Sequence, residues 1–378
     1  MRSITIVGGG VVGTSLAYQL RDSAFEVTLL EKRSLGAGTT SKSIACFGWY
    51  PLYSGHDRDL AVRSWDIYEP FVEDGSISYH QNGLLETAET EATFRQLKES
   101  VKALDAAGTP AEVLDPEDVE AFGVNPAVAS AGATFYPTAG RLDPAEIVAR
   151  FAELAREAGV TIETGVEVTD IRTDDAESIT IETSDGPLET DVLVNAAGPW
   201  AHQIDAMVGL TFPLRHTYAP IIVLETTENF ELPTVLLEDG RYFTGERSAK
   251  VLAGDAPHDS ADEDRWEAAL ELDAPETKEG LGIGSVSESH RQTVALEGPD
   301  IVPALEGAEI SNEWRGIRCL APDYRPIVGP TDVDGYYVAT GMSGWGITYG
   351  PACGELLADH LETGSMPDEL SYLSPDRF

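Results

Sequence analysis

Apolar positions in the first 31 residues predict one βαβ unit built around a glycine-rich turn. Residues 4–7 form a mainly apolar run typical of a buried strand, and residues 25–30 form a second run that ends at Glu31. Between them, the sequence Gly-Gly-Gly-Val-Val-Gly occupies positions 8–13, and residues 14–21 continue in a helical pattern. The unit therefore carries an acidic residue at the tip of its second strand.

Further along the chain, helical and strand patterns alternate, which indicates an α/β protein. The clearest helix follows Asp143, a favourable N-cap, with Pro144 at the first helical position and Gly159 just past its end. The same patterns predict further helices over 56–73, 92–107 and 116–122, a strand pair within 76–87, and strands over 160–163, 166–171, 179–183 and 191–195.

The pattern changes between residue 212 and about residue 305. Short strands over 221–224, 242–243 and 251–253, interrupted by an acidic helix over 262–272, predict an antiparallel sheet with a covering helix. The chain then shows again the pattern of its N-terminal region, with a strand over 336–340, a glycine-rich turn over 341–346 and a helix over 347–361. We therefore expect a dinucleotide-binding domain assembled from separated segments.

The charge is far more unusual than the 42% hydrophobic content. The chain has 65 Asp plus Glu against 25 Lys plus Arg, a formal net charge of -40. These acids are spread among periodic apolar residues, so a solvated acidic surface explains them better than an acidic tail. With few lysines as well, the composition is typical of salt-loving microbes, in which salt screens the self-repulsion. Nucleic acid and anionic membranes are unsuitable partners for such a surface.

The cysteines and the apolar runs point to an ordinary reduced, cytoplasmic protein. Cys46, Cys319 and Cys353 show no metal-like or CxxC spacing, so we expect neither a metal site nor a disulfide scaffold. No apolar run approaches the roughly 18 residues that a membrane span requires, and only three residues precede the first strand. The oligomeric state is not indicated by the sequence.

The glycine-rich turn predicts a dinucleotide site. In a G-x-G-x-x-G turn, Gly8 permits the tight turn, Gly10 lets the backbone approach a pyrophosphate, and Gly13 lets the helix pack on the strand. The pyrophosphate would lie at the helix N-terminus. Glu31 would accept hydrogen bonds from a ribose, which favours FAD or NAD over a 2′-phosphorylated cofactor. The alternative is a glycine-rich turn in an ordinary α/β protein.

Seven motifs follow one another along nearly the whole chain. They are GGGVVG with Glu31, the Gly-Ala-Gly-Thr-Thr-Ser loop at 36–41, Tyr136-Pro137-x-x-Gly140-x-Leu142-Asp143-Pro144, residues 194–200 (VNAAGPW), Trp314-x-Gly316-x-Arg318, Pro322-Asp323-x-x-Pro326-Ile327-x-Gly329, and Gly341-x-Ser343-Gly344-x-Gly346. In this order they resemble the D-amino acid oxidase-like FAD oxidoreductases, which include glycine and sarcosine oxidases, D-proline dehydrogenases and dimethylglycine dehydrogenases.

The resemblance implies a fold, a cofactor and a reaction. It implies an α/β (overall α+β) chain with a Rossmann-type FAD-binding domain formed by 1–75, 138–210 and 310–378, and an inserted, mainly antiparallel-sheet substrate domain formed by 76–137 and 211–309. The family transfers a hydride from an amine-bearing substrate carbon to flavin N5, and water then hydrolyses the imine. We expect a small amino acid substrate, with oxygen or another acceptor reoxidising the flavin.

The resemblance also implies site residues. Arg318 would bind the substrate carboxylate, because a guanidinium makes two parallel charge-assisted bonds. The 341–346 turn would face the flavin ring, with Trp345 and Tyr242 in the substrate cavity; Tyr218, His216, Arg215 and Arg291 are weaker candidates. The cofactor-binding candidates are Gly8, Gly10, Val11, Val12, Gly13, Glu31, Lys32, Arg33, Thr39, Thr40, Ser41, Val168, Ala196, Ala197, Gly198, Trp200, Gly316, Arg318, Gly341, Ser343, Gly344, Trp345, Gly346 and Ile347.

Departures from the family pattern bear on how FAD is held. Members with covalent FAD carry a His in the Gly-Thr-Thr-Ser loop or a Cys near the C-terminal motif. Here the loop has Lys42 and Ser43, and Cys319 directly follows Arg318 at a spacing that does not match. We therefore expect non-covalent FAD and a packed Cys319 thiol. The lack of an Arg in the 341–344 turn favours a sarcosine-like or proline-like secondary amine.

Two other functions remain open on the same scaffold. A 2-hydroxy acid dehydrogenase would need a general base, usually His, and none of the seven histidines lies in a recognised motif. An FAD-holding non-catalytic subunit of a larger complex would have no use for the carboxylate-binding arginine of Trp314-x-Gly316-x-Arg318. Both are therefore less favoured than amino acid oxidation.

Overall fold

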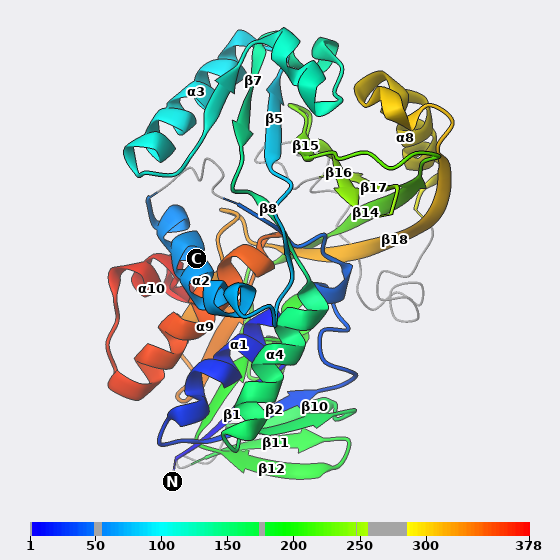
Figure 1. Ribbon diagram of the computed structural model, residues 1–378. Coiled ribbons are helices and arrows are strands. Elements are labelled where there is room, and N and C mark those ends of the chain that lie inside the picture. Colours follow the sequence, from blue (N-terminus) through cyan, green and yellow to red (C-terminus); the bar gives the residue numbers. More distant parts are fainter. Residues whose placement is uncertain (1, 49–54, 174–177, 247, 256–285) are drawn as a thin grey trace.

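The computed structural model describes residues 2–48, 55–173, 178–246, 248–255 and 286–378. Figure 1 shows two regions stacked on each other, each built around its own sheet. The region at the bottom of the view contains the first strand and the C-terminal helices. The predicted helix over 262–272 lies outside the described residues.

The lower region contains a six-stranded sheet in the order β19-β20-β13-β1-β2-β9. All neighbouring strands are parallel except the β19–β20 pair. This sheet confirms the predicted Rossmann-type fold. Its strands are β1 (Ser3–Val7), β2 (Glu26–Glu31), β9 (Thr161–Thr164), β13 (Val192–Asn195), β19 (Ile327–Pro330) and β20 (Tyr336–Thr340).

Helices pack against this sheet through a shared apolar core. The core joins residues such as Ile4, Leu16, Phe151 and Leu357, all fully or almost fully buried. The contributing helices are α1 (Val11–Gln19), α2 (Gly55–Glu73), α4 (Pro144–Glu157), α9 (Gly346–Thr363) and α10 (Asp368–Leu373). As predicted, Asp143 caps α4 by accepting from the amides of Ala145 and Glu146.

Glycines let α9 approach α1 closely. A Cβ atom added to Gly354 would lie 2.8 Å from the Ser15 Oγ and 2.9 Å from the Leu16 amide nitrogen, both on α1. One turn earlier, a Cβ on Gly350 would lie 3.3 Å from the Val12 side chain. Because the two helices pack this tightly, their N-termini are held side by side at the same edge of the sheet (Figure 1).

The upper region is an eight-stranded sheet in the order β18-β14-β17-β16-β15-β5-β7-β6. Its pairs are antiparallel except β15 with β5, in agreement with the predicted mainly antiparallel sheet. The strands are β5 (Leu84–Ala88), β6 (Glu112–Leu114), β7 (Gly132–Tyr136), β14 (Arg215–Glu225), β15 (Thr234–Leu236), β16 (Arg241–Glu246), β17 (Lys250–Asp255) and β18 (Glu309–Leu320). Helices α3 (Glu91–Ala106) and α8 (Glu288–Ile301) accompany this sheet.

Smaller elements complete the fold. Strands β10 (Val168–Arg172), β11 (Ile179–Thr183) and β12 (Gly186–Thr190) form one small sheet, and β3 (Cys46–Phe47), β8 (Gly140–Leu142) and β4 (Tyr79–His80) form another. The short helix α5 (Ala201–Met207) follows the turn after β13.

The structure differs from the sequence prediction in several places, including the following four. The strands expected as a pair within 76–87 do not pair with each other, because β4 joins β8 whereas β5 joins β7. The helix expected over 116–122 is a 3₁₀ helix. Helix α8 was not predicted, because Gly298 and Pro299 lie inside it. The predicted division at residue 310 assigns β18 to the FAD segment, whereas β18 pairs with β14 in the eight-stranded sheet.

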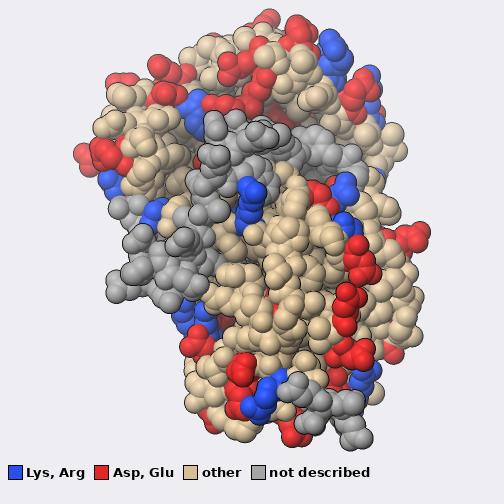
Figure 2. All heavy atoms as spheres, turned by 180° about the vertical axis from the view of Figure 1, so that it is seen from behind, with Lys and Arg blue, Asp and Glu red and all other residues tan. Residues whose placement is uncertain are grey.

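Acidic residues are spread over the surface of the molecule (Figure 2). Figure 2 shows Asp and Glu spread over the top, the right side and the base of one face, and not gathered into one patch. This distribution agrees with the solvated acidic surface expected from the composition. Among the helices of the described residues, none combines the length and the apolar character needed to cross a membrane.

Candidate active site

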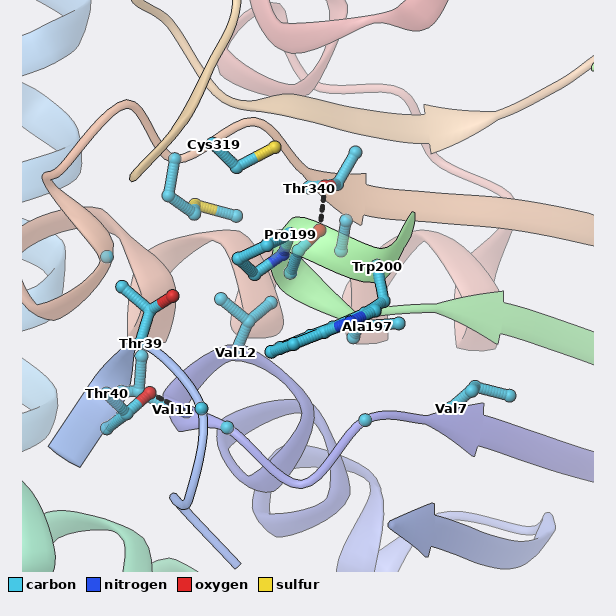
Figure 3. Close-up of a pocket in the computed structure, with 18 of the residues that line it drawn as sticks. Val7, Val11, Val12, Thr39, Thr40, Ala197, Pro199, Trp200, Cys319 and Thr340 are labelled. Atoms are coloured by element: carbon cyan, nitrogen blue, oxygen red, sulfur yellow. Dashed lines mark hydrogen bonds between the residues drawn. The ribbon is translucent and has the colours of Figure 1, made fainter. Parts of the chain in front are cut away.

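A groove of about 180 Å³ opens at the carboxyl edge of the six-stranded sheet. Figure 3 shows Val11, Val12 and Thr40 on one wall and Pro199, Cys319 and Thr340 on the opposite wall. The lining residues come from both helix N-termini, the tip of β2, the 37–43 loop and the turn after β13. A groove at this edge of a doubly wound sheet is the expected ligand position.

The glycine-rich turn has the backbone geometry predicted from the sequence. Gly8 has a φ of +112°, and a Cβ there would lie 2.4 Å from the Ala196 carbonyl oxygen. A Cβ on Gly13 would lie 1.9 Å from the Gly8 carbonyl oxygen, so only glycine permits this contact between helix and turn. Gly13 therefore shapes the turn from behind, and it is not one of the residues that line the groove.

Two helix N-termini face the groove, and both suit an anion. Neither α1 nor α9 has an acidic residue in its first turn or a side-chain hydrogen bond from its N-cap residue. Their first residues, Val11 and Gly346, both line the groove. Because the helix dipole favours negative charge, these ends can hold a phosphate group and a negatively charged ring edge. In this structure the Val11 amide donates to the Thr40 hydroxyl oxygen at 3.1 Å.

The groove also carries the acid at the tip of β2, beside the glycine-rich turn. The Glu31 carboxylate accepts from the Gly9 amide at 2.7 Å and from the Arg33 amide at 2.9 Å. Beside it, the Lys32 ammonium lies 4.3 Å from the centre of the Trp200 ring. Burial of Lys32 lowers the pKa of its ammonium group. This end therefore combines a carboxylate, a cation and an aromatic ring around one opening.

Asn195 fixes the turn that forms the far wall of the groove. Its side-chain oxygen accepts from the Ala197 amide at 3.2 Å, and its nitrogen donates to Ala201 O at 2.9 Å and to Asp205 Oδ1 at 2.8 Å. Tyr336 donates to the same Asp205 oxygen at 2.7 Å. Burial raises the pKa of the Asp205 carboxyl. Sequence reasoning named the turn but did not find this supporting network.

These features fit a dinucleotide such as FAD. Replacing glycine at position 8 or 13 would drive a side chain into the turn, and the first residue of α1 lines the groove, so the positive end of the helix dipole faces it. The acid at the β2 tip stands where a ribose hydroxyl would be recognised. The described residues show no cluster of His, Cys, Asp and Glu that could hold a metal ion.

A second, larger cavity of about 810 Å³ lies under the eight-stranded sheet. One row of cross-strand neighbours defines the face that looks into it, because paired residues in a sheet point to the same side. This row contains Thr134, Glu86, Leu236, Tyr242, Gly254, Ile221 and Trp314. The groove and the cavity share five lining residues, which are Thr39, Ser43, Arg318, Gly344 and Ile347.

The Trp314-x-Gly316-x-Arg318 motif alternates along β18, so all three residues face the site. The Trp314 indole donates to Lys42 O at 3.1 Å, and a Cβ on Gly316 would lie 3.2 Å from the Lys42 Cβ. One residue on, the Ile317 carbonyl accepts from the Thr39 hydroxyl at 2.8 Å. These contacts bind β18 to the loop after β2 and leave Arg318 at the junction of groove and cavity.

Arg318 is held by an acid at the end of β17. Its Nη2 donates to Asp255 Oδ1 at 2.9 Å and also to the backbone carbonyl of the same residue. The Arg318 side chain is 11% exposed and that of Asp255 is 23% exposed. Sequence reasoning did not identify Asp255, because nothing in its local pattern distinguishes it among 65 acidic residues.

Tyr242 and Trp345 both line the cavity. Tyr242 is almost fully buried, and this burial raises the pKa of its hydroxyl, so the phenol stays protonated and can donate a hydrogen bond. Trp345 precedes α9 and packs against the apolar cluster that contains Leu84 and Tyr136. The weaker candidates Tyr218, His216, Arg215 and Arg291 line neither the groove nor the cavity.

Most of the predicted cofactor residues line the groove, with a few exceptions. Gly13 and Ser41 line neither space, whereas Gly316 and Trp345 line only the cavity. Cys319 is 7% exposed at the groove wall, and burial raises the pKa of its thiol to about 12. The groove residues that sequence reasoning missed are Val7, Leu30, Ala37, Gly38, Ser43, Val166, Glu167, Pro199, Gln203, Ile204, Met207, Cys319, Ala339, Thr340 and Met342.

Comparison with protein families agrees with this geometry. The family model described as "DAO: FAD dependent oxidoreductase" matches residues 3–360. Mitochondrial dimethylglycine dehydrogenase of Rattus norvegicus is 29% identical over 390 residues, which cover 99% of this chain and 44% of that protein. The chain thus spans less than half the length of this relative.

Two further proteins match over nearly their whole length. Glycine oxidase from Geobacillus kaustophilus (strain HTA426) is 26% identical over 386 residues, covering 99% of this chain and 96% of that protein. The crystal structure of L-proline dehydrogenase from P. horikoshii has a TM-score of 0.85 at 24% identity, covering 100% of this chain and 97% of that chain. At 24% identity, the match to L-proline dehydrogenase shows a shared fold and no more than that.

Proposed function

The chain belongs to the DAO family of FAD-dependent oxidoreductases, and on this basis we propose that it oxidises the C–N bond of a small amino acid. The observation that carries the proposal is the position of Arg318, which lines both the groove that fits a dinucleotide and the larger cavity. A carboxylate bound there would leave its α-carbon near the boundary between the two spaces. Bound FAD would supply the hydride acceptor.

In the proposed mechanism, the residues of this chain position the substrate. Arg318 binds the carboxylate through its guanidinium fork, and this exchange releases Asp255. Tyr242 donates a hydrogen bond from a hydroxyl that stays protonated. The reacting carbon must be held within about 3 to 3.5 Å of its acceptor. The imine product is then hydrolysed by water.

The proposal assigns cofactor roles to the groove residues. The α1 N-terminus would hold the pyrophosphate, Glu31 would hold the ribose, and the α9 N-terminus at Gly346 would stabilise negative charge on the ring system. We propose non-covalent FAD with Cys319 as a packed thiol, and a chain divided into an FAD-binding and a substrate-binding domain near the predicted boundaries, except that β18 belongs to the eight-stranded sheet. If the flavin is not covalent, acid precipitation will release it from the protein.

The test is anaerobic bleaching of the flavin absorbance in high salt. The panel contains glycine, sarcosine, both enantiomers of proline and other amino acids, and matched 2-hydroxy acids. Reduction by an amine supports the proposal. Reduction by hydroxy acids alone identifies a 2-hydroxy acid dehydrogenase, and reduction by neither class identifies a non-catalytic flavoprotein. Reoxidation with oxygen and with a dye acceptor then distinguishes an oxidase from a dehydrogenase.

A further inference from the structure

Glu86 is a carboxyl group on the wall of the large cavity, away from the groove. It lies on β5, directly across from Thr134 on β7 and from Leu236 on β15. Leu236 in turn lies across from Tyr242 on β16. Glu86 therefore points to the same face of the sheet as Tyr242 and lines the same cavity.

The carboxyl of Glu86 lacks a strong protein partner. Its one hydrogen bond among the described residues comes from the Tyr136 hydroxyl at 3.4 Å, which is long for an O–H donor. That hydroxyl also accepts from Thr134 at 3.0 Å. No Lys, Arg or His of the described residues lies within ion-pair distance of Glu86. A partly buried carboxyl of this kind is costly unless a ligand pairs with it.

The space between Glu86 and Tyr242 suits an aliphatic chain. Leu84, Leu97 and Leu236 line this part of the cavity, and α3 covers the sheet here through Leu97. Two strand spacings separate β5 from β16, which corresponds to roughly 10 Å. A volume of about 810 Å³ is in the range that holds ligands much larger than glycine.

We infer that Glu86 recognises a cationic group at the far end of an extended substrate whose carboxylate is bound by Arg318. The substrate class is then an amino acid whose side chain or N-substituent is several methylene groups long and ends in an ammonium or a guanidinium. Its methylene groups pack against the leucine wall between the two charged contacts. This inference rests on the proposed function and narrows it.

The test compares ligands that differ only in the terminal group. Lysine is compared with 2-aminoheptanoate, in both enantiomers, and N-(5-aminopentyl)glycine with N-hexylglycine, by the rate of anaerobic flavin reduction. As a readout that needs no turnover, 6-aminohexanoate and heptanoate are titrated as ligands that perturb the flavin spectrum. The wild-type protein is expected to favour the cationic member of each pair by about ten-fold or more.

Glu86→Gln should abolish that preference, because it removes the charge and keeps the shape. The matched control is Glu89→Gln, which removes a carboxylate three residues along the same segment at an exposed position outside the cavity. The control should keep the preference of the wild type. The cationic and the methyl-ended ligands are compared first on the wild-type protein. The inference therefore stays testable if a variant fails to fold.

Two outcomes overturn the inference. One is a wild-type preference for the methyl-ended ligands, and the other is a preference for cationic ligands that Glu86→Gln leaves unchanged. In both cases amines still reduce the flavin, so the proposed function survives. If no amine in any arm reduces the flavin, the proposed function fails, and this inference fails with it.

Discussion

The guanidinium of Arg318 and the carboxylate of Asp255 form an ion pair 2.9 Å long where the groove meets the large cavity. Asp255 ends β17 and Arg318 lies near the end of β18, with β14 between the two strands. Both side chains are largely shielded from water. A substrate carboxylate that binds Arg318 must therefore compete with an internal carboxylate for the same donors.

Replacing Arg318 with Lys should raise KM strongly while FAD remains bound. A lysine keeps the charge but cannot make the two parallel bonds, and losing one charge-assisted bond costs about 1.5 to 3 kcal/mol, equivalent to roughly 10-fold to 100-fold in KM. Steady-state kinetics and the flavin absorbance of the purified variant measure the two effects. Arg315→Lys is the control, because Arg315 lies on the same strand over the Tyr218 ring and lines neither space. A near-normal KM for Arg318→Lys would refute the assignment.

Replacing Asp255 with Asn should lower KM by several-fold. The amide keeps the size of the side chain but no longer competes as an anion for Arg318, so less interaction is lost when the substrate binds. The measurement is KM together with the affinity of an unreactive carboxylate such as acetate. A higher KM and weaker acetate binding would instead show that Asp255 orients Arg318 for its substrate.

Replacing Gly13 with Ala should reduce both stability and FAD content. The added Cβ would lie 1.9 Å from the Gly8 carbonyl oxygen, so α1 must move away from the turn that holds the pyrophosphate. Gly364→Ala is the matched control, since Gly364 caps α9 with a φ of +71° and its Cβ would meet nothing within 4 Å. The control should lose about 1 kcal/mol of stability from backbone strain, with unchanged FAD content. Thermal melting and bound flavin per protein decide between the two expectations.

The thermal stability should rise with salt concentration. With a formal net charge of -40 and acids spread over the surface in Figure 2, repulsion among carboxylates destabilises the folded state when screening is weak. The Debye length is about 10 Å at 0.1 M and about 3 Å at 1 M. Melting temperatures are measured from about 0.1 M to several molar KCl, with sucrose as an uncharged control. An unchanged melting temperature across this range of salt would refute the salt-adapted interpretation.

The parts of the fold that the sequence predicted correctly are those in which a short run of residues already indicates where it lies in the folded chain. The apolar runs of β1 and β2 are buried on the sheet, and Gly8 and Gly13 have the backbone contacts that their spacing indicates. Arg318 was singled out because the short motif Trp314-x-Gly316-x-Arg318 resembles that of a known family, and the structure places it at the junction of the groove and the cavity. In each case a few residues that are neighbours in the sequence are enough for the prediction.

The missed parts depend on contacts between distant segments. Glycine is unfavourable in the interior of a helix, so the sequence gives no reason for Gly350 and Gly354 in α9. The reason is the close packing of α1, which leaves no room for a side chain at these positions. Glu86 lies in the sequence Leu84-Leu85-Glu86-Thr87-Ala88, which shows no clear alternation because both faces of β5 are covered. Asp255 becomes part of the site only because β14 pairs with both β17 and β18 and so brings Asp255 within reach of Arg318. None of these roles can be inferred from local sequence.

Glu86 should also give the protein a pH-dependent stability. Burial raises the pKa of this carboxyl from an ordinary 4.5 to about 7, and the hydrogen bond from Tyr136 only partly opposes this rise. A group that holds its proton more tightly when folded destabilises the folded state once it must ionise. The penalty is therefore absent below about pH 4.5, grows between pH 4.5 and 7, and is complete above pH 7.

Glu86→Gln removes that penalty, so the gain in melting temperature over the wild type should be small at pH 5 and reach a plateau above pH 7. The full effect corresponds to about 1 to 3 kcal/mol, or a few degrees for a chain of this size. Glu89→Gln, at the exposed position on the same segment, should show no such pH-dependent difference. If the difference between Glu86→Gln and wild type is the same at pH 5 and pH 8, Glu86 ionises as an ordinary surface carboxyl and the cost argued for its burial is absent.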